Sequence, residues 1–385
     1  MLKKIKLLLL IIILSLVPTF LVWTPFFLRL KSFWTIPLPQ DGMATIVANY
    51  DGPLFLVAAK TFYNLDLIQK FPFTLPSVYY AAHFPLFPLL IKPFAGILGF
   101  PYSMLFVTTL SSIFALYYFN KLMGEFVSKK DALWLTFVFS IFPARWLIVR
   151  SVGSAEPLFV AATIASLYYF RRQNYWATGI WGVIAQLTKS VGILLFFAYA
   201  ASFFWPRLKK AAATERGSWL SSLQLSTCLP IFLIPLALLG VFLLYKIKFN
   251  DFFAYFHSGD NIHLFFPPFQ IFNFRQPWVG TSWLEEIIFV YLFGILGIIK
   301  LIQKKETVLA WFVGIFFVST LFISHRDLLR YSLPLVPFLL VAFSEFLVKK
   351  EFKIAIAFLV IPIYLFALSF ISQNAMPISD WAPFL

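Results

Sequence analysis

Long apolar runs that recur along the whole chain constrain its fold more than any other feature. A helix needs roughly 17–25 mostly apolar residues to cross a bilayer. Hydrophobic residues make up 61% of the 385 residues and charged residues only 12%, so the chain suits lipid better than water. The runs that reach or approach spanning length are residues 5–27, 101–120, 132–149, 157–170, 174–187, 191–205, 223–246, 286–302, 307–324, 332–348 and 353–371. The sequence therefore predicts an all-α, polytopic helical membrane protein with about 11 transmembrane helices in a single integral membrane domain, residues 1–385.

Basic residues lie in short clusters between these runs. The clusters fall on the side of the N-terminal lysines if the eleven spans alternate, and they include Lys129-Lys130, Arg171-Arg172, Lys304-Lys305 and Lys349-Lys350. Cytoplasmic loops are enriched in Lys and Arg, so we expect a cytoplasmic N-terminus. The same clustering argues against nucleic acid as the partner of this chain, although its net charge is +15.

The opposite, outer side receives the polar groups that suit acid–base chemistry. It holds all four histidines, His83, His257, His263 and His325. It also holds two long loops, and long ordered loops are usually functional. We therefore expect the active site on the outer, non-cytoplasmic face. The expected organisation is outer loop 1 with interfacial helices at 28–100, a central helical module at 101–246, a second outer loop at 247–285 and C-terminal helices at 286–385.

Two segments have more than one interpretation. Residues 1–27 could be a signal peptide, but no small-residue cleavage site follows them, so we expect an uncleaved first span. Residues 84–99 are apolar but contain three prolines and Lys92. A full span there would place Lys129 and Lys130 on the outer side of the membrane, away from the other basic clusters, so we expect an interfacial or re-entrant helix.

Acidic residues of the first outer loop are the first candidates for catalysis. Asp51 follows Tyr50 and precedes Gly52 and Pro53, and Asp41 lies ten residues before it. An aspartate in an aromatic loop can act as a general base or bind a sugar hydroxyl. It can also cap a helix that begins at Gly52, because proline favours the first helical turn. The two interpretations are compatible.

Two further residues stand next to prolines at the expected outer ends of spans. Glu156 lies at the mouth of the span 157–170, where a carboxylate is costly unless it is solvated or paired. This position indicates a cavity, and a simple loop carboxylate is the alternative. His83 precedes Phe84 and Pro85 and could bind substrate, or it could mark only the start of an interfacial helix.

Cationic residues near the outer face could bind phosphate. Lys189 follows Thr188 in a polar break between two apolar runs. A lysine beside hydroxyls can bind a phosphate, or its stem can simply extend to the interface. Arg326 and Arg330 could hold an anionic lipid headgroup, and an ion pair of Arg326 with Asp327 is the alternative.

Nucleotide-dependent chemistry has no support in the sequence. It contains no P-loop, no dinucleotide-binding glycine pattern and no clustered metal-ligand spacing. The energy for any transfer must then lie in the substrate, and we expect no cofactor and no metal. His257, Asp260 and His263 could gather around a divalent ion, but solvated loop side chains are the favoured interpretation.

These motifs, in this order, resemble the GT-C glycosyltransferases, and most closely the GPI mannosyltransferase II (PIG-V-like) family. The similar stretch runs from about Asp41 to Leu195, and Arg330-Tyr331 with Pro334 adds to it. It contains an aspartate in the first outer loop, then Phe84-Pro85-Leu86, Glu156-Pro157-Leu158-Phe159 and Leu187-Thr188-Lys189-Ser190. The family typically has Arg-Trp-Asp where this chain has Asn49-Tyr50-Asp51, and an arginine where it has Lys189.

The resemblance implies an inverting transfer of a hexose, with mannose as the expected sugar, from a polyprenyl-phosphate donor such as a dolichol-phosphate sugar. The acceptor would be a lipid or a glycan, and membrane lipids would surround the enzyme. The implied general base is Asp51, with Asp41 and Glu156 as further catalytic candidates. Lys189, Arg326 and Arg330 would bind the donor phosphate, and His83, Tyr50, Thr188 and Tyr331 would bind substrate.

Three other functions remain open from the sequence. A transporter or flippase of lipid-linked glycans is the first, although no inverted repeat is visible and polar residues lie at the ends of spans. A polymerase or ligase of lipid-linked oligosaccharides would place basic residues in the same way. A non-enzymatic scaffold would fit if the departures at Asn49 and Lys189 removed activity.

Overall fold

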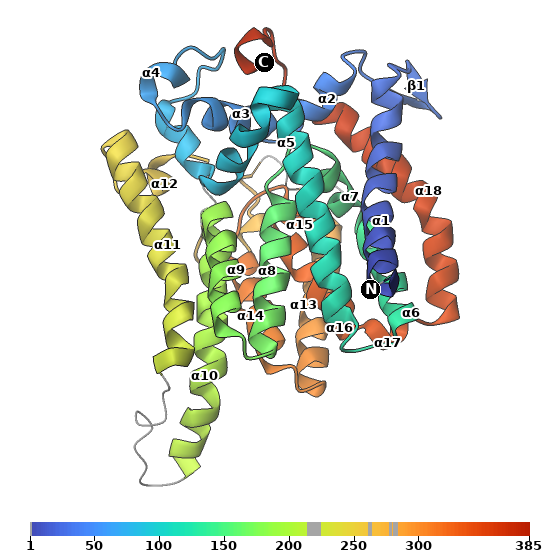
Figure 1. Ribbon diagram of the computed structural model, residues 1–385, viewed down its shortest axis with the longest axis vertical. Helices are drawn as coiled ribbons and strands as arrows, with labels where there is room; N and C mark the ends of the chain where they lie inside the picture. Colours follow the sequence, from blue (N-terminus) through green and yellow to red (C-terminus); the bar gives the residue numbers. More distant parts are fainter. Residues whose placement is uncertain (1, 214–224, 261–263, 277–278, 280–283) are drawn as a thin grey trace.

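Helices make up nearly all the regular structure of the computed structural model, which describes residues 2–213, 225–260, 264–276, 279 and 284–385 (Figure 1). The longer helices are α1 (Leu2–Phe27), α5 (Leu86–Met123), α6 (Lys129–Ile141), α8 (Glu156–Arg171), α9 (Tyr175–Thr188), α10 (Ile193–Ala213), α11 (Leu225–Phe249), α13 (Glu285–Gln303), α14 (Thr307–Leu321) and α18 (Lys350–Gln373). The only strands in these described residues, β1 (Ser32–Phe33) and β2 (Ile36–Pro37), form an antiparallel hairpin. The all-α fold class is confirmed.

Short helices connect and cap the long ones. The short α-helices are α2 (Met43–Val47), α3 (Gly52–Thr61), α4 (Leu65–Ile68), α7 (Ala144–Ser151), α12 (Ala254–His257), α15 (Leu328–Tyr331), α16 (Val336–Ala342) and α17 (Ser344–Leu347). The 3-10 helices are η1 (Ser77–Ala82), η2 (Ser190–Gly192), η3 (Gln270–Phe272), η5 (Leu333–Leu335) and η6 (Ala382–Phe384).

Helix α8 forms the centre of the bundle. It packs against α5 and α9, and α9 in turn packs against α11. Every residue from Glu156 to Tyr168 is buried. Alanine, serine and threonine recur in this stretch, and small residues let helix backbones approach closely. The start of α8, where Glu156 lies, is therefore fixed on all sides.

A cap of short helices covers one end of the bundle. Figure 1 shows α2, α3 and α4 at this end, together with the C-terminus of the chain. Every residue of α3 except Lys60 is buried, and a helix that is apolar on all sides is one enclosed by its neighbours. The long loop predicted at 28–100 is therefore an ordered, mostly helical cap, and we call this end of the bundle the cap end.

The apolar segment 84–99 becomes the first part of α5. The helix is interrupted at Gly99, whose φ of 72° and ψ of 160° lie outside the helical region. Glycine adopts positive φ without the steric cost that a Cβ brings. The break separates this segment from the longer, better-buried part of α5 that follows Pro101. Its interfacial or re-entrant placement stays a prediction.

The apolar helices identify an integral membrane protein, but the count of about 11 spans is not confirmed. Among the described residues, four helices are long and apolar enough to cross a membrane, and these are Ile5–Phe27, Leu86–Met123, Leu229–Phe249 and Lys350–Gln373. A fifth is added if α6 and α7, which are bent by 72°, form one broken span. Shorter apolar helices cover Ser190–Trp205, Thr307–Leu321 and Leu328–Ala342.

Two predicted spans are not continuous helices. The run 132–149 is interrupted at Phe142 and Pro143, because proline lacks the N–H that a helix interior needs. The run 332–348 divides into η5, α16 and α17. The first two residues of the predicted span 223–246 lie outside the described residues.

A buried arginine fixes the position of α7. Arg150 donates from Nη2 to the Ser15 carbonyl at 2.6 Å and to Ser15 Oγ at 2.7 Å, and from Nη1 to the Ser140 carbonyl. The side chain is fully buried, so these hydrogen bonds offset much of the cost of removing its charge from water. Arg150 thereby joins α7 to α1 and α6, and α7 carries another arginine, Arg145, toward the cap end.

Close packing of α9 on α11 gives a test of this fold. A Cβ built on Gly179 would lie 2.1 Å from the Pro230 carbonyl oxygen, whereas one on Gly240 meets nothing within 4 Å. We expect Gly179→Ala to destabilise the protein by about 1–3 kcal/mol, because the clash is with backbone. Thermal unfolding in detergent should show a lower melting temperature for this variant, with no decrease for the matched Gly240→Ala. Equal melting temperatures for the two variants would contradict the α9–α11 packing.

Candidate functional site

A cavity of about 830 Å³ lies beneath the cap. This size is within the range of roughly 300–1,000 Å³ typical of small-ligand sites. Its walls come from the N-terminal end of α3, the end of η1, the α9–η2 turn, the segment 325–331 and the C-terminal end of α18. The polar side chains that line it are Tyr50, Asp51, His83, Arg145, Thr188, Lys189, Ser190, Tyr255, Asp260, Glu286, His325, Arg326, Asp327, Arg330, Tyr331, Gln373 and Asn374.

Arg330 joins two carboxylates at the base of this cavity. Its Nη2 donates to Asp51 Oδ2 at 2.7 Å, and its Nε donates to Glu156 Oε1 at 2.7 Å. The guanidinium also lies over the Tyr50 ring, 4.2 Å from the centroid. A planar guanidinium with several fixed donors suits such a shared arrangement better than an ammonium group does.

Asp51 occupies the N-cap position of α3, but its side chain makes no capping hydrogen bond. The helix start is therefore as the sequence predicted, while the carboxylate accepts a hydrogen bond from Arg330 instead. About a third of the side chain, 32%, remains exposed. Asp51 therefore precedes the helix without capping it through its side chain, and its carboxylate lines the cavity.

Glu156 lies just below the cavity lining. Its Oε1 accepts from Lys189 Nζ at 2.8 Å as well as from Arg330, and its Oε2 accepts from the Ser154 hydroxyl. Only 4% of its side chain is exposed. A buried carboxylate needs such partners, so Glu156 fixes the two cations rather than meeting a ligand itself. It is not among the lining residues.

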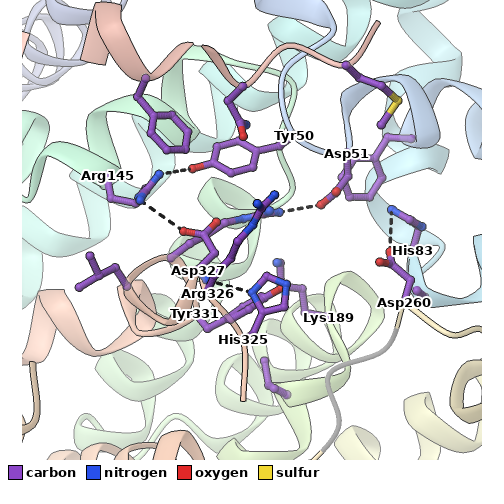
Figure 2. A pocket seen from close by; sticks show the side chains of 18 of the residues that line it. Tyr50, Asp51, His83, Arg145, Lys189, Asp260, His325, Arg326, Asp327 and Tyr331 are labelled. Carbon is purple, nitrogen blue, oxygen red and sulfur yellow. Dashed lines mark hydrogen bonds and ion pairs between the residues drawn. The ribbon is translucent and has the colours of Figure 1, made fainter. Parts of the chain in front are cut away.

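A second ion pair forms the opposite wall of the cavity in Figure 2. Arg145 Nη1 donates to the Tyr50 hydroxyl at 3.0 Å, and its Nη2 lies 3.5 Å from Asp327 Oδ1. The Arg145 guanidinium also stacks 3.9 Å from the Phe370 centroid. Arg145 was not among the residues predicted from the sequence. The signal that could have found it is a charge inside the predicted span 132–149, because charges within spans tend to be functional.

His83 and Asp260 face each other on the side of Asp51. The His83 Nε2 lies 4.0 Å from Asp260 Oδ2. His83 follows η1 in the first long loop, and Asp260 belongs to the second. The structure therefore brings both predicted long loops into one site.

The remaining predicted site residues divide into two groups. Thr188, Arg326 and Tyr331 line the cavity, and Arg326 is exposed with no ion-pair partner in the described part of the chain. Asp41 is exposed in the turn before α2 and does not line the cavity. Asp41 is therefore not brought together with the other candidates.

The three residues considered for a metal have different surroundings. His257 is exposed and its Nδ1 lies 2.6 Å from Asp251 Oδ2, whereas Asp260 faces His83. His263 lies outside the described residues. Within the described ranges, no three His, Cys, Asp or Glu side chains are arranged to hold a metal ion.

The cavity shifts the pKa values of its loop residues in different directions. Burial raises the pKa of Asp51, but the Arg330 guanidinium and His83 lower it more, and it ends below its ordinary value. Burial also lowers the pKa of His83, against the opposing effect of Asp51 and Asp260, and this shift favours the neutral imidazole. Burial raises the pKa of Asp260, and His83 offsets only part of this shift.

Comparison with known proteins identifies the fold. No family model and no curated protein sequence matches the chain. Solved structures do: ArnT from Cupriavidus metallidurans bound to undecaprenyl phosphate is similar with a TM-score of 0.55 and 14% identity, over 91% of this chain and 63% of that one. The oligosaccharyltransferase AglB from Archaeoglobus fulgidus, with an inhibitory peptide and a dolichol-phosphate, gives a TM-score of 0.51 at 14% identity, over 98% of this chain and 57% of that one.

A structure of the Archaeoglobus fulgidus oligosaccharyltransferase with Zn and sulfate is also similar. Its TM-score is 0.52 at 14% identity, and the match covers 96% of this chain and 54% of that one. The chain thus spans only about half to three-fifths of the length of these proteins. This chain therefore shares the helical fold of these three structures. The resemblance to the PIG-V-like family is not confirmed.

The buried position of Glu156 gives a stability test of the site. Replacing it with Gln removes the charge that Lys189 and Arg330 share, and loss of one partner from a buried ion pair costs about 3–5 kcal/mol. We therefore expect Glu156→Gln to lower the melting temperature in detergent clearly. The matched variant is Glu345→Gln, which breaks an exposed pair with Lys304 and should leave the melting temperature unchanged. A Glu156→Gln protein as stable as the wild type would contradict the buried pairing.

Proposed function

We propose that this chain is an integral membrane glycosyltransferase that transfers a sugar from a polyprenyl-phosphate donor to a hydroxyl acceptor. The observation that carries this proposal is the arrangement of one cavity. A partly exposed carboxylate, Asp51, lies next to a set of cations that includes Arg330, Lys189 and Arg326. Such a site offers a proton acceptor and an anion-binding surface within reach of each other.

The structural neighbours support the same substrate class. The ArnT structure contains undecaprenyl phosphate, and the AglB structure contains a dolichol-phosphate. Both ligands are long isoprenoid chains that end in a phosphate. A donor of this kind would place its hydrocarbon among the membrane helices and its phosphate in the cavity, which gives a reason for the site to lie in a membrane protein.

The cations of the cavity are not equally available to a phosphate. Arg330 and Lys189 both form ion pairs with Glu156, and Arg330 also forms an ion pair with Asp51. Arg326 has no ion-pair partner among the described residues and is exposed in the lining. We therefore assign Arg326 the first contact with the donor phosphate. Lys189, with 24% of its side chain exposed, and Arg330 complete the anion site from below.

The proposed reaction is a single displacement with inversion at the anomeric carbon. The acceptor hydroxyl gives its proton to the Asp51 carboxylate as its oxygen forms the new glycosidic bond. The bond between the anomeric carbon and the phosphate oxygen breaks, and its electron pair leaves with the lipid phosphate. Cationic groups then stabilise the extra negative charge on this leaving group.

Other lining residues would position the substrates. Tyr50 is held between Arg145 and Arg330, so its ring forms a rigid wall beside Asp51. Thr188 and Tyr331 line the cavity next to Lys189 and Arg330 and would contact the sugar or the phosphate. We place Glu156 as a residue that positions the cations and leave Asp41 out of the site.

We also propose that the cavity opens on the non-cytoplasmic face. Helix α8 begins at Glu156 beside the cavity and ends at Arg171, so the two residues mark opposite ends of the bundle. The end with Arg171 also holds Lys304, which pairs with Glu345 at 2.7 Å. The positive-inside rule assigns that end, and the N-terminus, to the cytoplasm.

A hexose, with mannose as the first candidate, remains the proposed sugar on the basis of the sequence resemblance. The likeness to oligosaccharyltransferase structures supports one alternative, in which a whole lipid-linked oligosaccharide is transferred. Donors that carry one sugar or several would separate the two functions. We expect transfer from the single-sugar donor, and transfer only from the longer donor would favour the alternative.

The first test of this function is transfer from radiolabelled polyprenyl-phosphate-mannose to a lipid-extract acceptor pool, with purified protein in liposomes. We expect Asp51→Asn to reduce the rate by about 10²–10⁴-fold, which is the usual contribution of a positioned general base. Glucose and other hexosyl donors follow if mannose is not transferred. Asp41→Asn is the matched comparison, and loss of transfer in that variant, with Asp51→Asn active, would contradict the assignment of the base.

Phosphate binding is tested by the donor KM. Arg326→Ala should raise it about 10- to 100-fold, because a hydrogen bond to a charged group contributes roughly 1.5–3 kcal/mol. Lys189→Ala should also raise it, and the acceptor KM should not change in either variant. The control is Arg275→Ala, an exposed arginine of the second long loop that does not line the cavity. An unchanged donor KM in both cavity variants would contradict the phosphate site.

A further inference from the structure

The side of the cavity formed by His83 and Asp260 has unused hydrogen-bonding capacity. The two side chains lie 4.0 Å apart between Nε2 and Oδ2, which is too long for a hydrogen bond. His83 is buried, with only 4% of its side chain exposed, and its Nδ1 has no hydrogen-bond partner in the described part of the chain. Asp260 is 33% exposed and forms no ion pair with a described Lys or Arg.

A hydroxyl group fits this arrangement. His83 Nε2 and Asp260 Oδ2 are 4.0 Å apart, so one oxygen atom can lie about 2.8 Å from each of them. The His83 Nε2–H can donate to that oxygen. The Asp260 carboxylate can accept the hydroxyl proton in a second hydrogen bond. The pair therefore offers a complete set of partners to an alcohol.

The charges around this pair disfavour an anion. Asp51 interacts with both His83 and Asp260, and the nearby Arg330 is already shared by Asp51 and Glu156. The Tyr79 hydroxyl, which also contacts Asp260, adds no positive charge. A negatively charged group here would meet two carboxylates, and the two cations that act on this pair, Arg330 and Lys189, already pair with Glu156.

We propose that His83 and Asp260 form a subsite that holds a hydroxyl of the acceptor beside Asp51 and selects an uncharged, polyhydroxylated acceptor over an anionic one. This inference rests on the proposed glycosyl transfer and adds the chemical class of its second substrate. It also separates the cavity into two parts. Arg326 and Lys189 would receive the donor phosphate, and the His83–Asp260 pair would receive the acceptor.

The fold brings the two residues of this subsite together from two separate loops. His83 and Asp260 are far apart in sequence, and each reaches the cavity from a different long loop. The ring of Phe55, from α3, packs edge-on against the His83 ring at 4.9 Å between centroids. The Tyr63 hydroxyl donates to the His83 carbonyl at 2.6 Å. His83 is thus held rigidly, as a residue that selects a substrate should be.

The test uses two alkyl glycosides as probes that compete with the acceptors of a lipid extract. Octyl mannoside is uncharged, and octyl glucuronide carries a carboxylate. Transfer from radiolabelled polyprenyl-phosphate hexose is measured with wild-type protein, Asp260→Asn and the matched control Asp251→Asn. Asp251 belongs to the same loop and also pairs with a histidine, His257, but it does not line the cavity.

We expect octyl mannoside to inhibit the wild type at concentrations at least about tenfold lower than octyl glucuronide, since one charge-assisted hydrogen bond contributes that much. In Asp260→Asn this preference should decrease by a similar factor, and the acceptor KM should rise while the donor KM is unchanged. Asp251→Asn should behave as wild type. His83→Phe, which keeps a ring but loses the donor, should show the same acceptor-specific increase, and His83→Gln should restore part of the affinity.

Several outcomes would overturn the subsite. The first is an Asp260→Asn protein that keeps the wild-type preference for octyl mannoside over octyl glucuronide. The second is an Asp260→Asn or His83→Phe protein in which only the donor KM increases. The third is a wild type that neither glycoside inhibits. Melting temperatures measured on the same samples identify a variant that is only unfolded, and the second variant then decides. A wild type that transfers no sugar from any polyprenyl-phosphate donor to the extract would instead contradict the proposed function itself.

Discussion

The shared ion pair of Arg330 with Asp51 and Glu156 is the interaction on which the rest of the site depends. It joins the N-terminal ends of two helices, α3 and α8, to the short helix α15. A guanidinium removed from water is costly unless its donors are satisfied, and both carboxylates lie at 2.7 Å. The cap and the bundle are therefore held together at the same point where the cavity has its base.

This interaction also determines which charges remain for a substrate. Glu156 and Asp51 balance Lys189 and Arg330, and Arg145 is balanced by Asp327, so Arg326 is the uncommitted cation among the described lining residues. On the other side, Asp260 lines the cavity and forms no ion pair with a described Lys or Arg. The cavity thus has a cationic part and an acidic part, which is the arrangement that a phosphate donor and a hydroxyl acceptor would need.

The sequence predicted the fold class and many of the residues that line the cavity, because both depend on local patterns. Apolar runs predicted helices, and short motifs singled out Asp51, Lys189 and Arg330, which line the cavity. Arg145 and the role of Asp260 could not be recognised in this way, because their partners are distant in sequence and only packing brings them together. The span count is not confirmed, for a related reason: hydropathy does not show where a run bends, as at Pro143, or divides, as within 332–348.

The most direct measurement of the central claim is a structure of the protein in a lipid nanodisc with a non-hydrolysable phosphonate analogue of a polyprenyl-phosphate hexose. The account predicts that the phosphonate oxygens contact Arg326 and Lys189 within hydrogen-bonding distance. It also predicts that the anomeric carbon faces Asp51, with the space beside His83 and Asp260 left open for the acceptor. A headgroup bound outside this cavity, or a sugar turned away from Asp51, would contradict it.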